Sequence, residues 1–301
     1  MRLTRAAALS AVLALGLGVL AACGGGEGGG EPATGETPVP SVSFEPGTTM
    51  DRLYKEQKIR IGTKFDQPGF GKANLEGVPE GFDVEIGKII AFELGIPEEN
   101  IEWIETPSRV REEYIEQGRV DIVVATYTIN DTRKERIDFA GPYYVAGQQI
   151  MVRADDDSIT GPEDFRAGDK KVCSATGSTP AENIANYLAD VGSQLVLFDT
   201  YDKCLDPLRN GDVDAVTTDN VILLGYVAQS PGEFKLVGTK FTVEPYGIGL
   251  KKGDDAFRDF INDVLEKIYA DGRYAAAWSA TAGQFDPTIP EAPEVDRYTS
   301  E

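Results

Sequence analysis

An arginine follows a short apolar segment at a spacing that suits it to bind a carboxylate. Residues 120–125 read VDIVVA and predict a buried strand, after which Thr128 supplies a hydroxyl. Arg133 lies five residues beyond Thr128, in the first turn of the next predicted helix. Because open α/β sheets collect ligands where their strands end, its planar guanidinium is placed to grip a carboxylate bidentately. The same spacing also fits a solvated charge cluster with residues 134–136, and spacing alone does not separate the two interpretations.

Histidine is absent from the chain, which limits the chemistry that it can perform. Without histidine there is no His-based triad, and the commonest general base is missing. A metal site would need histidine or more than the three cysteines present. We therefore expect no catalytic residue, no metal and no cofactor, and the chemistry to look for is binding.

The first 22 residues predict an export signal that is absent from the mature protein. They begin with basic Arg2 and Arg5, continue with an apolar run and end in Leu-Ala-Ala before Cys23. This is the pattern of bacterial lipoproteins, so Cys23 is the expected site of acylation, and several acyl chains anchor a protein better than one. An ordinary cleaved signal with a chance cysteine is the alternative. Residues 23–50 offer almost nothing to bury and predict a flexible Gly/Pro/Glu tether.

The net charge of −21 restricts the partners of the chain. Such a surface disfavours nucleic acid and anionic lipid and favours solubility. No apolar run of membrane length follows the signal, so the mature part is expected at the outer face of the cytoplasmic membrane, held by its lipid alone. In an exported chain an isolated cysteine pair is expected to be oxidised, which predicts a disulfide between Cys173 and Cys204.

Two βαβαβ segments, joined by two extended crossings, account for most of the chain. The crossings at 143–153 and 234–249 predict a hinge of limited freedom. Strands are predicted at 58–64, 101–105, 121–125, 171–173, 194–198 and 214–218, and helices at 82–94, 109–117, 179–191, 201–209, 220–228 and 254–278. The expected parts are a discontinuous first lobe (51–146 and 246–283), a second lobe with the hinge strands (147–245) and an acidic tail (284–301).

Three motifs, in two segments of the chain, carry a resemblance to a known family. Residues 126–133 read Thr-x-Thr-x-Asn-x-x-Arg, residues 137–144 read Ile-Asp-Phe-x-x-Pro-Tyr-Tyr, and residues 81–91 read GFDVEIGKIIA. Together they resemble the polar amino acid family of periplasmic-type solute-binding proteins, which feed ABC importers. Within it, segments 58–71, 125–131 and 172–184 are most similar to the glutamate-binding lipoproteins of actinobacterial importers. The resemblance, over roughly residues 50–285, implies an α/β, two-lobed periplasmic-binding-protein-like fold, each lobe an open wound and mostly parallel sheet with flanking helices.

The resemblance also implies how an amino acid would be held. Arg133, with the amide and hydroxyl of Thr128, is implied for the α-carboxylate. Asp219, with the carbonyl of Thr126, is implied for the ammonium, although Asp219 also fits a plain N-cap of the helix that follows it. The second lobe would add amides at the start of a helix, where the alternative is a simple Ser/Thr cap; these amides belong to Gly177, Ser178 and Thr179.

A third group of residues would select the side chain of the ligand. Lys64, Ser108 and Arg111 match positions that contact the distal carboxylate in acidic amino acid binders of this family, and the alternative is that Lys64 and Arg111 are exposed charges. Phe65 or Phe70 would wall the ligand stem or belong to the core. Because glutamine would leave a cation unpaired in a closed site, at a cost of about 1–3 kcal/mol, L-glutamate is the expected ligand, with aspartate and glutamine as alternatives.

The expected function is binding without catalysis. The chain would be a monomeric, lipid-anchored receptor that captures an amino acid by lobe closure and passes it to the transmembrane subunits of an ABC permease. One rival is an amino acid sensor that docks a membrane signalling partner. The other, less favoured, is a dehydratase-like enzyme on the same scaffold.

Overall fold

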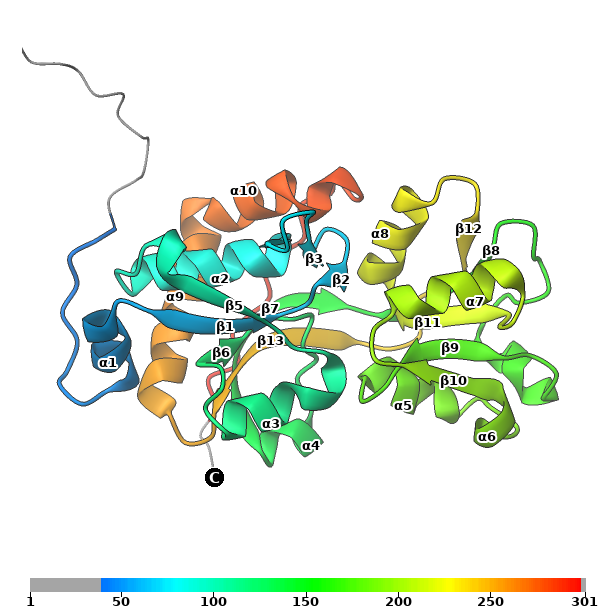
Figure 1. Ribbon diagram of the computed structural model, residues 1–301, viewed down its shortest axis with the longest axis horizontal. Coiled ribbons are helices and arrows are strands. Elements are labelled where there is room, and N and C mark those ends of the chain that lie inside the picture. Colours follow the sequence, from blue (N-terminus) through cyan, green and yellow to red (C-terminus); the bar gives the residue numbers. More distant parts are fainter. Residues whose placement is uncertain (1–38, 299–301) are drawn as a thin grey trace, which may run out of the picture. The chain divides into compact units, whose positions relative to one another are not determined.

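The computed structural model describes residues 39–298. The predicted signal peptide, Cys23 and the first part of the predicted tether lie outside the described residues. Residues 39–298 form two lobes, each built on a five-stranded sheet (Figure 1). Within this part of the chain, no helix has both the length and the apolar character needed to span a membrane.

Lobe 1 takes segments from both ends of the described chain. Its strand order is β5-β1-β6-β13-β7, in which β5, β1 and β6 run parallel and β13 pairs antiparallel with both β6 and β7. Helices cover both faces, with α2 and α10 on one and α3 and α4 on the other (Figure 1). The elements are α1 (Thr49–Glu56), β1 (Ile59–Thr63), α2 (Phe82–Glu93), β5 (Ile101–Glu105), α3 (Arg111–Glu116), β6 (Ile122–Val123), α4 (Asp131–Lys134), β7 (Ile137–Ala146), β13 (Glu244–Lys251), α9 (Asp255–Asp271) and α10 (Arg273–Ala280).

Lobe 2 repeats this plan. Its strand order is β10-β9-β11-β8-β12, with β10, β9 and β11 parallel and β8 antiparallel to both β11 and β12. The disulfide between Cys173 and Cys204 is present, with the two Cα atoms 5.7 Å apart, as predicted. The elements are β8 (Gln148–Arg153), β9 (Val172–Ala175), α5 (Thr179–Ala185), α6 (Val191–Gln194), β10 (Leu195–Phe198), α7 (Leu205–Asn210), β11 (Ala215–Asp219), α8 (Asn220–Gln229) and β12 (Phe234–Val237).

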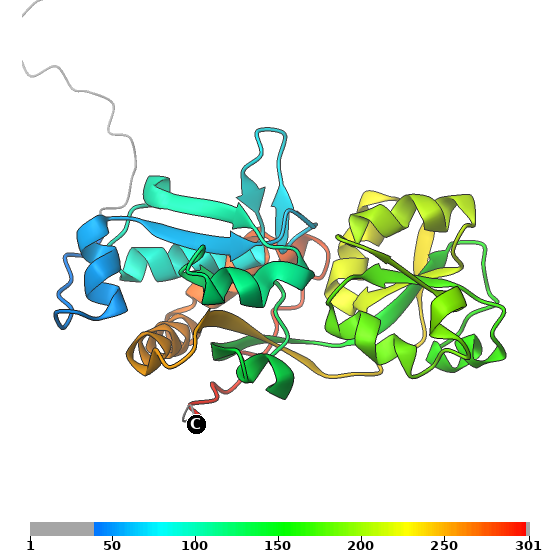
Figure 2. The same ribbon diagram turned by 60° about the horizontal axis from the view of Figure 1, so that its bottom comes forward.

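The two crossings between the lobes run next to each other. β7 ends at Ala146, and after Gly147 the chain continues as β8 of lobe 2. The return segment enters β13 at Glu244, which pairs with Ala146. The two crossings therefore run alongside each other (Figure 2). In lobe 1, β13 pairs antiparallel with both of its neighbours, and in lobe 2, β8 does the same. Half of the strand pairings in each sheet are therefore antiparallel, and the sheets are mixed rather than mostly parallel.

Short elements connect the main strands and helices of both lobes. A three-stranded antiparallel sheet lies between β1 and α2; its strands are β2 (Asp66–Gln67), β3 (Gly71–Ala73) and β4 (Pro79–Glu80). The described residues also contain short 3-10 helices: η1 (Glu98–Asn100), η2 (Ser108–Val110), η3 (Pro162–Ala167), η4 (Asp202–Cys204) and η5 (Ala282–Gln284). The small sheet places Asp66 and Gln67, both buried, beside the end of β1.

The end of the predicted tether packs against lobe 1 instead of being flexible. The Phe44 ring lies 6.0 Å from that of Tyr54 and 5.6 Å from that of Phe260, both at edge-to-face angles. Thr48 then caps α1 by accepting a hydrogen bond from the amide of Asp51 at 3.2 Å. The expected tether therefore stops short of residue 50, because Phe44, partly buried, packs against the core of lobe 1 and α1 begins at Thr49.

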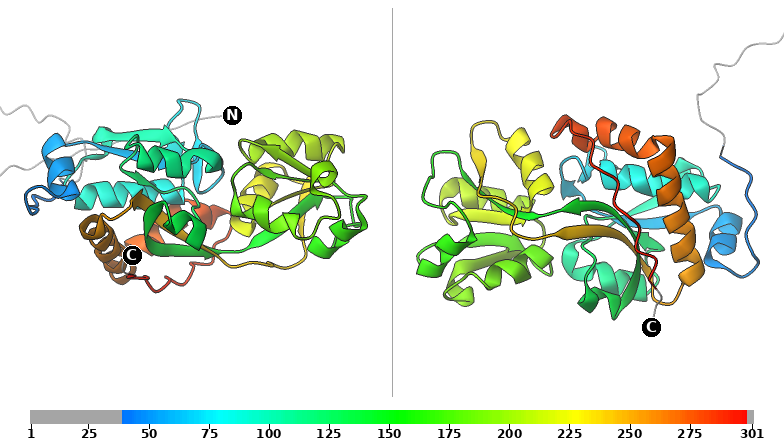
Figure 3. Two further views of the ribbon diagram at one scale, coloured as in Figure 1. Left: turned by 90° about the horizontal axis from the view of Figure 1, so that it is seen from below. Right: turned by 180° about the vertical axis from the view of Figure 1, so that it is seen from behind.

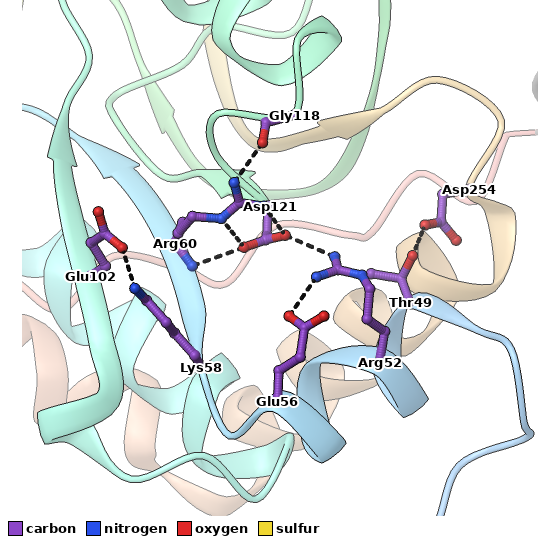
Figure 4. A network of polar contacts seen from close by, with 9 residues as sticks. All are labelled: Thr49, Arg52, Glu56, Lys58, Arg60, Glu102, Gly118, Asp121 and Asp254. Carbon is purple, nitrogen blue, oxygen red and sulfur yellow. Dashed lines mark hydrogen bonds and ion pairs between the residues drawn. The ribbon is translucent and has the colours of Figure 1, made fainter.

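An ionic network holds α1 to the opening strands of lobe 1 (Figure 4). At its centre is Asp121, directly before β6, whose carboxylate accepts from Arg52 at 2.8 Å and from Arg60 at 3.0 and 3.1 Å. The side chain of Asp121 is only 4% exposed, and although burial opposes its ionisation, the hydrogen bonds from Arg60 and Arg52 hold its pKa below the ordinary value. This network lies at the start of β6, opposite the end from which Thr126 follows.

An aromatic cluster fills lobe 1 beside the hinge strands. The Phe70 ring makes edge-to-face contacts with Phe82 at 5.9 Å, Tyr246 at 6.2 Å and Trp278 at 6.1 Å, and it is 1% exposed. Phe70 is therefore a core residue. The acidic tail crosses the back of the same lobe (Figure 3), where the amide of Asp296 donates to the carbonyl of Gly141 at 2.8 Å.

Candidate functional site

Arg133 is buried, although it lies in a short run of charged residues. Only 7% of it is exposed. Its Nη1 donates to the carbonyl of Thr128 at 2.6 Å, and its Nη2 donates across the lobes to the carbonyl of Gly177 at 3.4 Å. Its Nε is paired with Glu112 at 3.1 Å. The interpretation of Arg133 as part of a solvated cluster is therefore wrong, because its side chain lies between the lobes.

Arg111, the first residue of α3, is a second buried guanidinium. It is 2% exposed, and its Nη1 donates to the carbonyl of Ala125 at 2.9 Å. Its guanidinium carbon lies 4.0 Å from the centre of the Tyr127 ring, and that of Arg133 lies 5.0 Å from the same ring. An aromatic face attracts cations in this way. The alternative that Arg111 is an exposed charge is wrong.

Lys64 adds a third buried cation. It follows β1, is 4% exposed and donates from Nζ to Ser108 Oγ at 2.9 Å. Burial, and then the charges of Arg111 and Arg133, lower the pKa of Lys64 to about 7. The exposed-charge alternative is wrong for Lys64 as well. Phe65, next to it, is half-buried.

The segment from Ala125 to Thr128 turns sharply after β6. Thr126 has φ of +44°, in the left-handed region. Its amide donates to Asp83 at 2.7 Å, and its hydroxyl donates to Gln67 at 2.8 Å. Thr128, two residues later, forms a single bridge with Tyr246 of the return strand. The turn thus presents the carbonyls of Ala125 and Thr128 to the two buried guanidiniums.

Asp219 brings a buried carboxylate from lobe 2. It ends β11, is 3% exposed and accepts a hydrogen bond from the Tyr246 hydroxyl at 2.6 Å. Its other oxygen has no hydrogen-bond partner among the described residues. Asp219 stands at the N-cap position of α8, as the alternative expected, but its side chain makes no capping hydrogen bond. Burial, and then the charge of Glu244, raise the pKa of Asp219 to about 7.

The start of α5 faces lobe 1. Gly177, with φ of +72°, brings its backbone so close that a Cβ there would lie 2.8 Å from the Cα of Arg109. The hydroxyl of Ser178 accepts from the amide of Ala181 at 3.2 Å, so the Ser/Thr cap expected as the alternative is present. The hydroxyl of Thr179 is buried and has no partner within the described part of the chain.

Four residues around these charges were not predicted from the sequence. Glu112 pairs with Arg133, the Tyr127 ring lies within cation–π distance of both guanidiniums, and the Tyr246 hydroxyl donates to Asp219. Tyr201, in lobe 2, is buried, and its hydroxyl interacts electrostatically with both Asp219 and Arg111. Tyr127 lies inside the 126–133 motif, so its position could have indicated a place in the site, whereas the other three residues lie outside every motif.

A model of the bacterial extracellular solute-binding proteins, family 3, matches residues 59–279. The chain belongs to this family. Membership confirms the resemblance and the two-lobed fold, makes the chain a solute-binding protein rather than an enzyme, and agrees with a place outside the cytoplasm.

Individual relatives cover most of the chain. It is 40% identical over 295 residues to the glutamate-binding protein GluB of Corynebacterium efficiens, an alignment that covers 95% of this chain and 93% of that protein. It is 37% identical over 227 residues to the ABC transporter glutamine-binding protein GlnH of Bacillus subtilis, covering 75% and 81%. The solved structure of an ancestral arginine-binding protein bound to glutamine has a TM-score of 0.69 at 34% identity, covering 75% of this chain and 97% of that one.

Proposed function

We propose that this protein binds an acidic amino acid, with L-glutamate as the best fit, and delivers it to an ABC permease. The observation that carries the proposal is the arrangement of buried charge. Three cations of lobe 1, on Lys64, Arg111 and Arg133, act electrostatically on one another, and the two guanidiniums also act on Asp219 of lobe 2. A dicarboxylate with one ammonium complements this set, because it adds two negative charges and one positive charge.

The backbone groups of the amino acid would be held by residues from both lobes. Arg133 and Thr128 bind the α-carboxylate, and the amides of Gly177, Ser178 and Thr179 approach it from lobe 2. Asp219 binds the ammonium, together with the carbonyl of Thr126. The unpartnered oxygen of Asp219 supports this assignment, since a buried acceptor without a hydrogen bond is costly unless a donor arrives.

The distal carboxylate would be held by Lys64, Arg111 and Ser108. Lys64 and Arg111 each have donor capacity left for a ligand: Lys64 Nζ donates to Ser108 Oγ, and Arg111 Nε has no hydrogen-bond partner among the described residues. Glutamine is the rival ligand, because a relative 37% identical is a glutamine-binding protein. Phe65, beside Lys64, would border the ligand stem.

Binding by lobe closure is part of the proposal. Residues of both lobes surround the charged groups, so the ligand must enter while the lobes are apart and is then enclosed. Contacts made only in the closed state shift the equilibrium toward closure by their differential free energy. The closed, ligand-loaded form is the species that a permease, or in the rival proposal a signalling partner, would recognise.

A thermal-shift screen of the common amino acids, followed by calorimetry, tests the proposal. A ligand of the folded state raises the melting temperature, so glutamate should give the largest rise, with aspartate and glutamine behind. Arg133→Ala should abolish binding of every amino acid, because it removes a charge-assisted, bidentate grip. Arg136→Ala is the matched control, since Arg136 pairs with Glu116 at the surface and should leave binding unchanged.

The selective groups are tested separately. Arg111→Ala should weaken glutamate much more than glutamine, because only the acidic ligand needs the cation. A wild-type protein that prefers glutamine, or an Arg111→Ala protein that binds glutamate as wild type does, would contradict the acidic-ligand proposal. Slow turnover of glutamate or of a prephenate-like acid by the purified protein would favour the dehydratase-like rival.

Lipid anchoring is proposed from the Leu-Ala-Ala-Cys sequence that ends at Cys23. The mature protein would carry its lipid there and stay at the outer face of the cytoplasmic membrane. Mass spectrometry of the membrane-extracted protein should show an acylated N-terminal peptide, and Cys23→Ala should release the protein into the medium. An unmodified N-terminus on exported wild-type protein would contradict this part of the proposal.

A further inference from the structure

The GFD motif at residues 81–83 holds a buried carboxylate that no ligand role uses. Asp83 is the second residue of α2 and is 0% exposed. Its side chain does not cap the helix. One oxygen accepts from the Tyr143 hydroxyl at 2.6 Å, and the other accepts from the amide of Thr126 at 2.7 Å. Asp83 therefore ties α2 and β7 to the turn that follows β6.

The turn that Asp83 holds is strained. Among the described residues, Gln57 and Thr126 are the non-glycine residues with positive φ. Gln57 ends α1, where left-handed backbone is common. Thr126 is β-branched and ends no helix, and such a conformation costs about 1–3 kcal/mol and persists only where neighbouring groups enforce it. Two neighbouring side chains hold Thr126 in this conformation: Asp83 accepts a hydrogen bond from its amide, and Gln67 accepts one from its hydroxyl.

Both site guanidiniums are anchored to this same turn. The carbonyl directly before Thr126, that of Ala125, accepts from Arg111 at 2.9 Å. The carbonyl two residues after it, that of Thr128, accepts from Arg133 at 2.6 Å. If the turn relaxed, the two carbonyls would rotate apart and the spacing between the guanidiniums would change.

We infer that Asp83, supported by Tyr143, is a positioning residue that sets the spacing of Arg111 and Arg133 by locking the Thr126 turn. It touches no ligand group and acts through the backbone. This inference deepens the proposed function and rests on it for the identity of the ligand, but not for the effect on the turn. The GFD motif thus contributes to the binding site indirectly, without contacting the ligand.

The chain offers a matched control at the other end of the same strand. Asp121 precedes β6, as Thr126 follows it, and Asp121 is also a buried lobe 1 carboxylate held by several hydrogen bonds (Figure 4). Asp83→Asn and Asp121→Asn make the same chemical change. Both are expected to lower the melting temperature of the ligand-free protein, but only Asp83→Asn should alter binding.

The test combines calorimetry with hydrogen exchange on the full-length mature protein. Asp83→Asn should weaken glutamate binding by about tenfold or more, as expected for a lost charge-assisted hydrogen bond, and should lower the ratio of glutamate to glutamine affinity, because both guanidiniums shift. Asp121→Asn should bind both ligands within about twofold of wild type. Wild-type affinity and an unchanged ratio in Asp83→Asn would overturn the inference.

Hydrogen exchange separates this inference from the proposed function. In ligand-free protein, Asp83→Asn should speed exchange in the segment 125–133, and Asp121→Asn should not. If wild type bound no amino acid, the proposed function would fail, while the exchange result would still decide the role of Asp83. Should Asp83→Asn not fold, Tyr143→Phe replaces it: faster exchange in 125–133 supports the inference, and unchanged exchange overturns it.

Discussion

Asp219 and Lys64 change their proton affinities in opposite directions for one physical reason. Burial disfavours the charged form of each, so the pKa of Asp219 rises from 3.8 to about 7 and that of Lys64 falls from 10.5 to about 7. A ligand ammonium beside Asp219 and a distal carboxylate beside Lys64 restore both charges. Burial also raises the pKa of Asp83 to about 7, but its two oxygens already accept hydrogen bonds from the Tyr143 hydroxyl and the Thr126 amide, so no ligand group is assigned to it.

Glutamate binding should therefore release protons at low pH and take up protons at high pH. Below pH 7, Asp219 of the ligand-free closed protein is largely protonated, so binding releases up to about one proton. Above pH 7, Lys64 is largely neutral, so binding takes up to about one proton. Affinity should be greatest near pH 7 and fall on both sides. Calorimetry at pH 6 and pH 8, in buffers of different ionisation enthalpy, measures both proton numbers.

Lys64→Met is the control for this linkage. It should lose the proton uptake above pH 7 and keep the release below it, because Asp219 is unchanged. Equal proton numbers at pH 6 and pH 8 in wild type would contradict the assignment of the two groups.

The roles of the site residues were predictable only through the family resemblance. The sequence named Arg133, Arg111, Lys64 and Asp219, and the structure buries all four. Spacing could not decide whether each was exposed, because burial depends on segments far away in the chain. Glu112 is an example: it pairs with Arg133 only after α3 and α4 pack side by side, a contact that neither segment encodes alone.

At the scale of elements, the sequence predicted the strands and helices well and missed their interruptions. The third strand, expected at 121–125, is only β6, because the chain leaves the ladder to form the Thr126 turn. One long helix was expected at 254–278, and two are found, because Gly272 adopts φ of +86° between α9 and α10. Apolar spacing is the same in a broken helix and a continuous one, so periodicity could not show the break.

Gly272→Ala should destabilise the fold without joining the two helices. No atom lies within 4 Å of the Cβ that it would add, so the penalty comes from left-handed backbone alone and amounts to about 1–2 kcal/mol. Urea unfolding measures the change in free energy. Gly161→Ala is the control, because that glycine is extended, has equal space and should tolerate alanine at no cost. Equal stability of the two variants would contradict the argument.

The disulfide between Cys173 and Cys204 should stabilise lobe 2 without affecting ligand choice. It joins β9 to η4 across a sequence separation of 31, and closing a loop of this length contributes about 3–4 kcal/mol in the chain-entropy estimate. The double variant Cys173→Ser, Cys204→Ser should lower the free energy of unfolding by about that amount. Calorimetry should give an unchanged order of ligand affinities, and a changed order would contradict a purely structural role.

At the scale of the whole protein, the lobes meet at several points outside the charged site. Arg109 pairs with Asp199 at 2.8 Å, the amide of Tyr201 donates to Asp66 at 3.1 Å, and Tyr226 donates to the backbone of Asp66 at 3.1 Å. These contacts contribute to the closed state whatever the ligand is. They therefore help to determine how often the ligand-free protein is closed, and with it the apparent affinity for any ligand.

Gly225 of α8 offers a way to oppose closure without damaging either lobe. A Cβ at Gly225 would lie 2.7 Å from the carbonyl oxygen of Pro68 in lobe 1, too close for any atom pair of this kind. Within α8 itself, alanine is a better helix former than glycine by about 1 kcal/mol. Gly225→Ala should therefore leave the ligand-free protein as stable as wild type or more so, while overpacking the lobe contact by about 1–3 kcal/mol.

The expected result is a weaker apparent affinity for every ligand by about tenfold, because the binding-competent closed state becomes rarer. The ratio of glutamate to glutamine affinity should not change, which separates this effect from that of Arg111 or Asp83. Gly192→Ala is the control: it lies in α6 of lobe 2, and its nearest neighbour is an ordinary 3.5 Å contact with Asp190. Calorimetry gives the affinities, and small-angle scattering with saturating ligand gives the compaction. Wild-type affinity in Gly225→Ala would mean that the Pro68 contact is not formed on closure, and the lobes would then have to close about a different axis.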